Sequence, residues 1–363
     1  MIRLFRPCIP VDEVLVELRP VLESGWIEPG PKVKEFEQEF ARRVGARFGV
    51  STHSGTAALH LAAKALGLAP GSKVLTTPVT FISTNMVLLY EHLTPVFCDV
   101  EERTGNIDFH SVESLARQHK PAAIMVVHLG GYPCDLDAIN GLAEELKIPV
   151  IEDCAHALGA TYRGKRIGDT NNLCCWSFQA TQNLPTGDGG MITTHSEAVA
   201  GRLRRLRSMG IDKSTVERSR EGKSRIYSVE HLGYRYHMND LAATIGLVML
   251  RHLDEHNRRR AEIAARYQAN LGGYAPAYRD DRQSSYHFVP MFFPHRDAMR
   301  QKLEAAGIEW GYHYAPNYEF TGVFVDCEAP PHARQYSTLE LTLPLHPSLT
   351  DEEVDTIIAV VKS

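Results

Sequence analysis

Short apolar runs alternate with helix-like patterns in this chain from Phe48 to about Thr193. Turn residues bound the apolar runs, and the segments between them repeat apolar residues at helical spacing. This alternation is typical of βαβ units, whose successive strands lie parallel in one sheet. Each of the clearest runs leads into polar residues at its carboxyl end, which is the edge where α/β sheets bind ligands. The expected strands are Lys73–Thr77, Pro95–Asp99, Ala122–Val127 and Pro149–Asp153.

The rest of the chain predicts a second, smaller domain. Asn239–Leu271 has apolar residues at helical spacing, so we expect one long helix that connects the two domains. Beyond this helix the chain returns to short strands, such as His287–Phe293. We therefore expect a large α/β domain with a central, mostly parallel sheet over residues 1–240. A smaller α+β domain, beginning with the linking helix, is expected over residues 241–363.

Composition excludes several kinds of partner. The net charge of -5 argues against nucleic-acid binding, because the phosphate backbone requires clustered excess Lys and Arg. No apolar run approaches the roughly 20 residues of a membrane span, and Met1–Pro7 is too short for a signal peptide, so we expect a cytoplasmic protein without a membrane partner. The 7 scattered cysteines and 17 histidines show no ligand spacing, so no metal site is expected.

An anion site is predicted where Ser54–Leu59 follows the apparent strand Phe48–Val50 and opens a helix. The first N–H groups of a helix have no partner within it, and together with the helix dipole they bind phosphate groups. The small Gly55 and Thr56 would let a phosphate approach closely. A Ser or Thr cap is the more common reason for such a segment, so the prediction depends on companion residues elsewhere.

Those companions suit pyridoxal phosphate (PLP). Asp153 ends an apolar strand, where a buried carboxylate can pair with a protonated pyridine nitrogen and make the ring an electron sink. His156 would reach the ring hydroxyl, Phe81 would stack on the ring, and Ser177 would add a hydroxyl to the phosphate. Each residue also has an ordinary structural interpretation: a helix-capping carboxylate, a buried histidine or a core phenylalanine.

Motifs spread over nearly the whole chain strengthen this interpretation. They are Gly30-Pro31, Ser54–Leu59, Thr80-Phe81, His128-Leu129, Glu152-Asp153, Ser177-Phe178, Gly187–Gly190, Gly233–Asp240 and Leu343–Pro347. In this order the chain resembles the DegT/DnrJ/EryC1/StrS family of sugar aminotransferases. The resemblance implies a fold-type I PLP enzyme that acts as a homodimer with shared active sites. It also implies transfer of an amino group from glutamate to a keto sugar, commonly nucleotide-linked, in the synthesis of amino sugars for polysaccharides such as lipopolysaccharide or for antibiotics.

The resemblance also implies a set of cofactor-binding residues: Gly55, Thr56, Phe81, Asp153, His156, Ser177, Asn183 and Arg235. In this set Asp153 pairs with the ring nitrogen and His156 contacts the ring oxygen. Arg235 stands where family members usually have an asparagine that reaches the neighbouring subunit's phosphate, and a charged donor can still bind a phosphate. The arginine that follows in the family is replaced by His237, which leaves that contact open.

Gln182 occupies the position of the lysine that forms a Schiff base with PLP in this family. With Asp153 and His156 it makes up the expected catalytic set. An amide has neither a nucleophilic amine nor a pKa suited to proton transfer, so transamination by this chain is expected to be absent or very slow. The chain is then an aminotransferase substituted to trap a cofactor–sugar adduct, a natural sugar dehydratase using PLP or pyridoxamine phosphate (PMP), or a non-catalytic binder of PLP or a sugar nucleotide. The intact cofactor residues favour the first interpretation.

Two segments are expected to contact the substrate. One contains the aromatic side chains Trp310, Tyr312, His313 and Tyr314. The other is the charged, Ser-rich stretch Asp212–Glu230, where Lys223 and Arg225 would meet a diphosphate or a carboxylate. Neither segment distinguishes one keto sugar or nucleotide from another.

Overall fold

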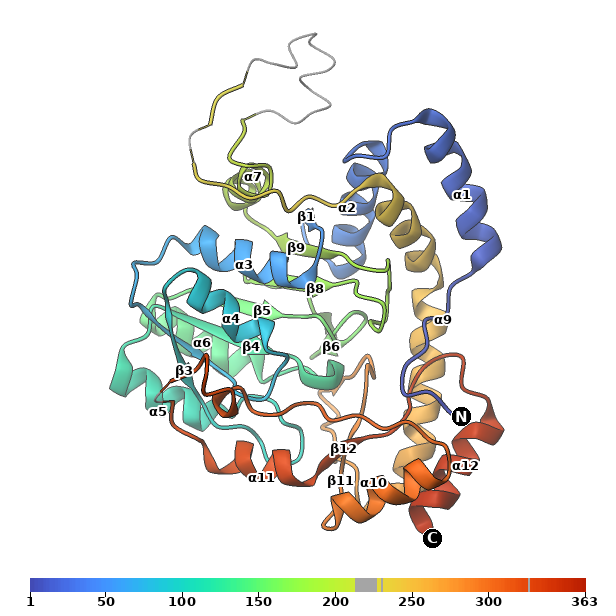
Figure 1. The fold of residues 1–363 in the computed structure, drawn as a ribbon. Helices are drawn as coiled ribbons and strands as arrows, with labels where there is room; N and C mark the ends of the chain where they lie inside the picture. Colours follow the sequence, from blue (N-terminus) through green and yellow to red (C-terminus); the bar gives the residue numbers. More distant parts are fainter. Residues whose placement is uncertain (213–226, 230, 326) are drawn as a thin grey trace.

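A seven-stranded sheet forms the centre of the computed structural model, which describes residues 1–212, 227–229, 231–325 and 327–363 (Figure 1). The strand order is β1-β9-β8-β5-β4-β2-β3. β9 runs antiparallel to β1 and β8, whereas β8, β5, β4, β2 and β3 pair in parallel. The expected mostly parallel sheet is therefore confirmed. The strands are β1 (Phe48–Thr52), β2 (Lys73–Thr76), β3 (Thr94–Phe97), β4 (Ala123–Val127), β5 (Val150–Asp153), β8 (Leu173–Ser177) and β9 (Gly190–Thr194).

Helices cover both faces of this sheet, which explains why its central strands are continuously apolar. Every residue of β4 and β5 is buried, as expected for strands packed on two sides. Along β4, Met125 packs with α3, α4 and α7, whereas Ile124 and Val126 pack with α5 and α6 on the opposite face. The covering helices are α3 (Gly55–Leu66), α4 (Ser83–Tyr90), α5 (Phe109–His119), α6 (Leu136–Leu146) and α7 (Glu197–Leu206).

The long helix α9 (Asp240–Leu271) confirms the expected connection, with Asn239 as its N-cap. Met249 and Leu253 pack into the core of the large sheet region. Ile263 and Tyr267, further along the helix, belong to a separate C-terminal core. The two helices α1 (Val11–Ser24) and α2 (Pro31–Val44) pack against α9, and Figure 1 shows α9 running beside the sheet toward the C-terminus. The domain limits at 240 and 241 stay a prediction.

The C-terminal part is built from short elements around this second core. A two-stranded sheet pairs β11 (Pro290–Phe292) with β12 (Glu340–Thr342). The expected strand His287–Phe293 is thus shorter than predicted, because the His287 N–H instead donates to the Gly130 carbonyl of the large domain at 3.0 Å. The other elements of this part are β10 (Arg282–Gln283), α10 (Arg296–Ala305), η2 (Asn317–Glu319), α11 (Pro331–Leu339) and α12 (Asp351–Lys362). Earlier in the chain lie the short elements η1 (Leu129–Gly131), β6 (Thr161–Tyr162) and β7 (Lys165–Arg166).

The expected substrate-binding residues Lys223 and Arg225 lie outside the described residues. Among the described helices, none is both long enough and apolar enough to span a membrane.

Candidate active site

A cavity of about 410 Å³ opens at the carboxyl ends of β5 and β8, beside the first turn of α3. It lies at the sheet edge that the sequence predicts, and the C-terminal part closes its other side through His287, His313 and Tyr314. The predicted site residues that line it are Gly55, Thr56, Phe81, Asp153, His156, Ser177, Gln182, His313 and Tyr314. The fold therefore brings together residues that are far apart in the sequence.

The turn into α3 has the form of an anion cradle. Ser54 caps the helix by accepting the Ala57 N–H at 3.2 Å. The other N–H groups at the start of the first turn have no acceptor within the helix. A Cβ placed on Gly55 would lie 2.7 Å from the Ser177 Cβ, so only glycine fits between the helix and the end of β8. Thr56 and Ser177 add hydroxyl groups to the lining. This donor set suits a phosphate group.

Asp153 supplies a buried carboxyl group in the cavity wall. Its Oδ2 accepts the Thr84 hydroxyl at 2.8 Å, and its Oδ1 accepts the Ala155 N–H at 3.1 Å. Burial raises the pKa of this carboxyl above its ordinary value, and both hydrogen bonds oppose that shift. A cationic group bound nearby would stabilise the ionised form, which is the electrostatic requirement of a protonated pyridine nitrogen.

His156 lies in a stack of rings that crosses from the large domain to the C-terminal part. Its ring stacks on His287 at a centroid distance of 4.4 Å, and its Nε2 lies 3.2 Å from the Tyr314 hydroxyl. Burial, with a smaller contribution from His313, lowers the pKa of His156 to about 3. Its Nδ1 is buried without a hydrogen-bond partner among the described residues. The imidazole is therefore neutral and keeps one nitrogen available to a ligand.

Gln182 lines the cavity from the loop between β8 and β9. Its backbone N–H donates to the Gln179 carbonyl at 2.9 Å, which fixes the turn. Its side-chain Oε1 is buried and has no hydrogen-bond partner in the described part of the chain. A side chain at this position thus faces the cavity, as a cofactor lysine must, but the amide offers no titratable group.

Four predicted residues lie away from the cavity lining. Asn183 is buried and donates to Asn257 Oδ1 at 3.0 Å and to the Ser285 carbonyl at 2.9 Å, while its Oδ1 lies 3.2 Å from His287 Nδ1. Arg235 is mostly exposed and lies 3.7 Å from Glu28. The cofactor contacts of Asn183 and Arg235 stay predictions.

Trp310 and Tyr312 are the other two. The Trp310 indole N–H donates to Glu304 at 3.0 Å, and the Arg296 guanidinium lies 4.9 Å from the centre of the Tyr312 ring. Both rings therefore face α10, whereas the neighbouring His313 and Tyr314 line the cavity. Phe81 is 56% exposed, with its ring centre 6.2 Å from that of Tyr314, so its face is free to stack on a ligand.

Sequence reasoning missed several residues that complete this site. Thr84 holds Asp153, and its hydroxyl also lies 2.8 Å from that of Thr80. Thr80 precedes α4 and Thr84 lies in its first turn, so helical spacing does not mark this pair in the sequence. Phe5 and His287 also line the cavity, but they come from the N-terminus and from a late loop, and no local pattern marks them.

A buried cluster near the site has the composition of a metal centre. His128, Glu152 and Cys154 place one ligand atom each within 4.8 Å of one another. His128 Nε2 is already 2.9 Å from Glu152 Oε2, and its Nδ1 accepts a backbone N–H at 3.1 Å. The other Glu152 oxygen accepts Thr170 at 2.8 Å and Asn172 at 2.7 Å. Hydrogen bonds satisfy the His128 and Glu152 ligand atoms, so the arrangement is that of a structural network.

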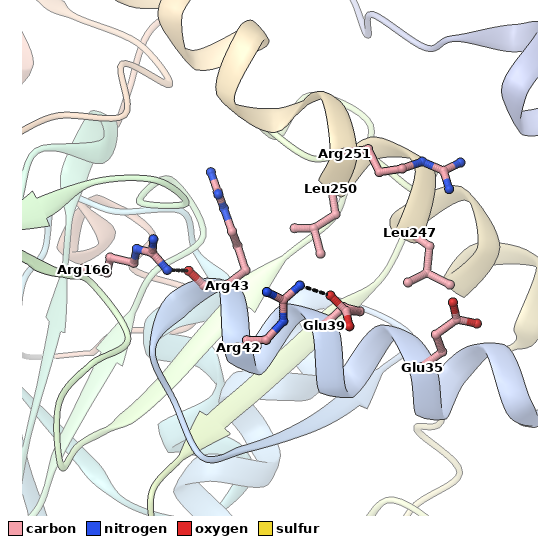
Figure 2. A pocket seen from close by; sticks show the side chains of 8 residues that line it. All are labelled: Glu35, Glu39, Arg42, Arg43, Arg166, Leu247, Leu250 and Arg251. Atoms are coloured by element: carbon pink, nitrogen blue, oxygen red, sulfur yellow. Dashed lines mark hydrogen bonds and ion pairs between the residues drawn. The ribbon is translucent and has the colours of Figure 1, made fainter.

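A second hollow, of about 390 Å³, lies between α2 and α9 (Figure 2). Figure 2 shows Arg42 bonded to Glu39 and the Arg166 guanidinium bonded to the Arg43 carbonyl, the latter at 2.8 Å. None of the predicted site residues lines this hollow. Its Glu35, Arg42, Arg43 and Arg251 side chains form ion pairs, and we assign the hollow no part in the chemistry.

Comparison with known proteins identifies the family of the chain. The model of the DegT/DnrJ/EryC1/StrS aminotransferase family matches residues 10–362. The spore coat polysaccharide biosynthesis protein SpsC of Bacillus subtilis is 38% identical, with 98% of this chain and 95% of SpsC covered. The sugar aminotransferase CalS13 from Micromonospora echinospora superposes with a TM-score of 0.91 at 32% identity, covering 100% of this chain and 99% of CalS13. Spr1654 from Streptococcus pneumoniae, solved in its PMP form, has a TM-score of 0.91 at 28% identity, with 99% and 98% covered.

Proposed function

Because this chain belongs to the DegT/DnrJ/EryC1/StrS aminotransferase family, we propose that its cavity binds PLP or PMP together with a keto sugar. The parent reaction is transfer of an amino group from glutamate to that sugar, which is nucleotide-linked. The observation that carries this proposal is the placement of a buried carboxyl, Asp153, in the same cavity as the anion cradle at Gly55, Thr56 and Ser177. A cofactor with one cationic ring nitrogen and one phosphate matches both features.

Each residue then has a defined part in binding and orientation. When bound, the cofactor supplies an electron sink for charge that develops on the substrate carbon. Asp153 holds the proton of the ring nitrogen by charge pairing, and Thr84 fixes the direction of the carboxylate. His156 offers its unpartnered Nδ1 to the ring oxygen, and Phe81 covers one ring face.

The dimeric arrangement is part of the same proposal. Arg235 does not line the cavity of its own subunit and is exposed, with Glu28 as an ion-pair partner at 3.7 Å. We assign it to the phosphate of the neighbouring subunit in a homodimer, where a guanidinium forms strong charge-assisted bonds. Asn183 acts on the cofactor indirectly, because its amide positions His287 and through that ring His156.

Gln182 removes the amine on which transamination depends. Its amide neither bonds covalently to the cofactor nor takes up and releases a proton near neutral pH, so the proton shuttle of the parent reaction has no carrier at this position. The chain as it stands therefore binds cofactor and sugar but turns over extremely slowly.

The test compares the chain with Gln182→Lys and with Gln182→Met, a length-matched variant without an amine. Each protein is mixed with PLP, and its absorbance spectrum is recorded before and after glutamate is added. We expect only the lysine variant to retain PLP covalently after borohydride treatment and to lose its visible band with glutamate. A comparable reaction of the unchanged chain with glutamate would overturn the inactivity, and a lysine variant that ignores glutamate would overturn the donor.

Product analysis with keto sugars decides the sugar half-reaction. The lysine variant, loaded with PMP, is expected to return an amino sugar and PLP. A product that has lost a hydroxyl without gaining nitrogen would instead identify a dehydratase.

A further inference from the structure

Glu340 is a fully buried carboxyl that the cofactor site does not use. It begins β12, in the C-terminal part of the chain, and lies behind the cavity wall. Its Oε2 accepts the backbone N–H of His313 at 2.9 Å, and its Oε1 accepts the Thr342 hydroxyl at 2.6 Å. Buried carboxyl groups need hydrogen-bond partners, and here the two partners, His313 and Thr342, also contact each other.

That chain of contacts continues into the cavity. The Thr342 hydroxyl lies 2.9 Å from Nδ1 of His313, and the His313 ring lines the cavity. The opposite ring nitrogen, Nε2, has no hydrogen-bond partner among the residues that the structure describes. Phe288 stacks on the ring at 4.6 Å, and the Tyr336 hydroxyl donates to the His313 carbonyl at 3.1 Å. The ring is thus held in place with one nitrogen directed at Thr342.

The geometry allows only one place for a proton on Glu340. Because Oε2 already accepts the His313 N–H, a carboxylic proton must sit on Oε1, which faces Thr342. Thr342 then donates to Nδ1 of His313, and the imidazole carries its proton on Nε2. With Glu340 ionised, Thr342 donates to the carboxylate instead, and Nδ1 must carry the imidazole proton. The protonation state of Glu340 therefore selects the tautomer of the His313 ring.

The surroundings favour the first state near neutral pH. Burial raises the pKa of Glu340 to about 8, against the opposing effects of its hydrogen bonds and of Arg296 on α10. Burial lowers the pKa of His313 to about 4, so this imidazole is neutral. The other titratable groups near the carboxyl are Tyr314 and Tyr336, whose pKa values are raised by burial, so both stay uncharged.

We propose that Glu340, Thr342 and His313 form a proton relay that ends in the cavity, with His313 as the acid that protonates the oxygen of the keto sugar. The proposal rests on the proposed function for the identity of the substrate. As a nitrogen nucleophile bonds the keto carbon, the C=O double bond becomes a single bond and its oxygen takes the proton of His313 Nε2. The Thr342 proton moves to Nδ1, and the Glu340 proton moves to Thr342. The imidazole stays neutral, Glu340 becomes negatively charged, and the nitrogen that has bonded the keto carbon becomes positively charged.

The relay is tested on the folded protein without substrate. With histidines labelled by nitrogen-15, the two ring nitrogens of His313, assigned through His313→Asn, report the tautomer between about pH 6 and pH 9. We expect a switch from Nε2–H to Nδ1–H near the Glu340 pKa of about 8. Glu340→Gln should remain Nε2–H throughout, since an amide can accept the His313 N–H and donate to Thr342. Thr342→Ser should keep the switch, whereas Thr342→Val should abolish it.

A tautomer switch that persists in Glu340→Gln, or one that survives in Thr342→Val, would overturn the relay. A second readout uses the Gln182→Lys background, where Thr342→Val should lower kcat about 10- to 100-fold and Thr342→Ser should restore most of it. If the switch is present but kcat is the same in all three proteins, the catalytic part of the proposal is wrong. If the lysine background aminates no keto sugar while the switch is present, the proposed function fails and the relay itself stands.

Discussion

The two walls of the cavity are built in different ways. The large-domain wall consists of residues that end strands or open a helix, such as Gly55, Asp153 and Ser177. The C-terminal wall consists of His287, His313 and Tyr314, which lie in irregular segments. On the first wall, backbone topology places each group at the sheet edge. On the second, side chains from remote segments hold one another, as in the contact of Tyr314 with His156, 158 residues apart in the sequence.

The two walls also carry different kinds of chemical group. The large-domain wall carries fixed recognition elements for a phosphate and a ring cation, which require only that helix ends and strand ends converge. The C-terminal wall carries neutral titratable groups whose pKa values burial has shifted, as for His313. Acid–base groups depend on their full surroundings, so this wall is sensitive to packing far from the cavity.

Phe288→Ala is expected to lower the free energy of unfolding most, because this side chain packs against both walls. Phe288 is fully buried in a cluster that contains Val79 and Leu129 of the large domain and Tyr336 of the C-terminal part. Its removal should lower the free energy of unfolding by about 3–5 kcal/mol, measured by urea denaturation. Phe293→Ala, in the C-terminal core alone, is the matched control. Both substitutions should lower the stability of the protein, but only Phe288→Ala should also weaken PLP binding. Equal PLP affinities of the two variants would contradict the proposed difference between the walls.

Asp153→Asn tests the large-domain wall alone. In the Gln182→Lys background it should lower kcat about 10²- to 10³-fold, since a neutral amide no longer stabilises the charged ring nitrogen. Thr84→Val removes one hydrogen bond to the same carboxylate and should cost about tenfold. Steady-state transamination measures both. A larger effect of Thr84→Val than of Asp153→Asn would show that orientation, not charge, limits the reaction.

The sequence predicts the first wall well and the second poorly. The strand that ends at Asp153 and the cap before Gly55 are local patterns, and local patterns of apolar spacing and capping determine where strands and helices end. Trp310 and Tyr312 were expected beside His313 and Tyr314, but their rings face α10. Which residues of a loop face a cavity depends on packing with distant segments, and Glu340 shows no local sign of its burial.

The pH dependence of stability also distinguishes the two walls, because groups of the C-terminal wall should determine how stability changes with pH near neutrality. Burial raises the pKa of Glu340 to about 8 from the ordinary value of 4.5, so the folded state keeps a proton that the unfolded chain releases. The free energy of unfolding should therefore fall as pH rises between these values, with a limiting slope of about 1.4 kcal/mol per pH unit. Glu340→Gln should remove this contribution to the slope.

His313 changes the free energy of unfolding with pH in the opposite direction and over a different pH range. Its pKa is lowered to about 4 from 6.5, so its contribution is complete above the higher value and is lost as the pH falls through the lower one. Urea denaturation between about pH 7 and pH 8 thus isolates Glu340. Parallel stability curves for the unchanged chain and Glu340→Gln in that interval would contradict the assignment.

The smallest expected effect on stability comes from Phe81→Ala, although Phe81 lies in the cavity. With 56% of its surface exposed, this ring contributes little to folding, and the free energy of unfolding should change by about 0.5 kcal/mol or less. PLP affinity should still fall about threefold to tenfold, because a stacked ring face is lost. Tyr90→Ala is the matched control, since Tyr90 is 52% exposed and does not line the cavity. Equal PLP affinities in the two variants, measured by equilibrium dialysis, would mean that the large-domain wall binds the cofactor through charge alone.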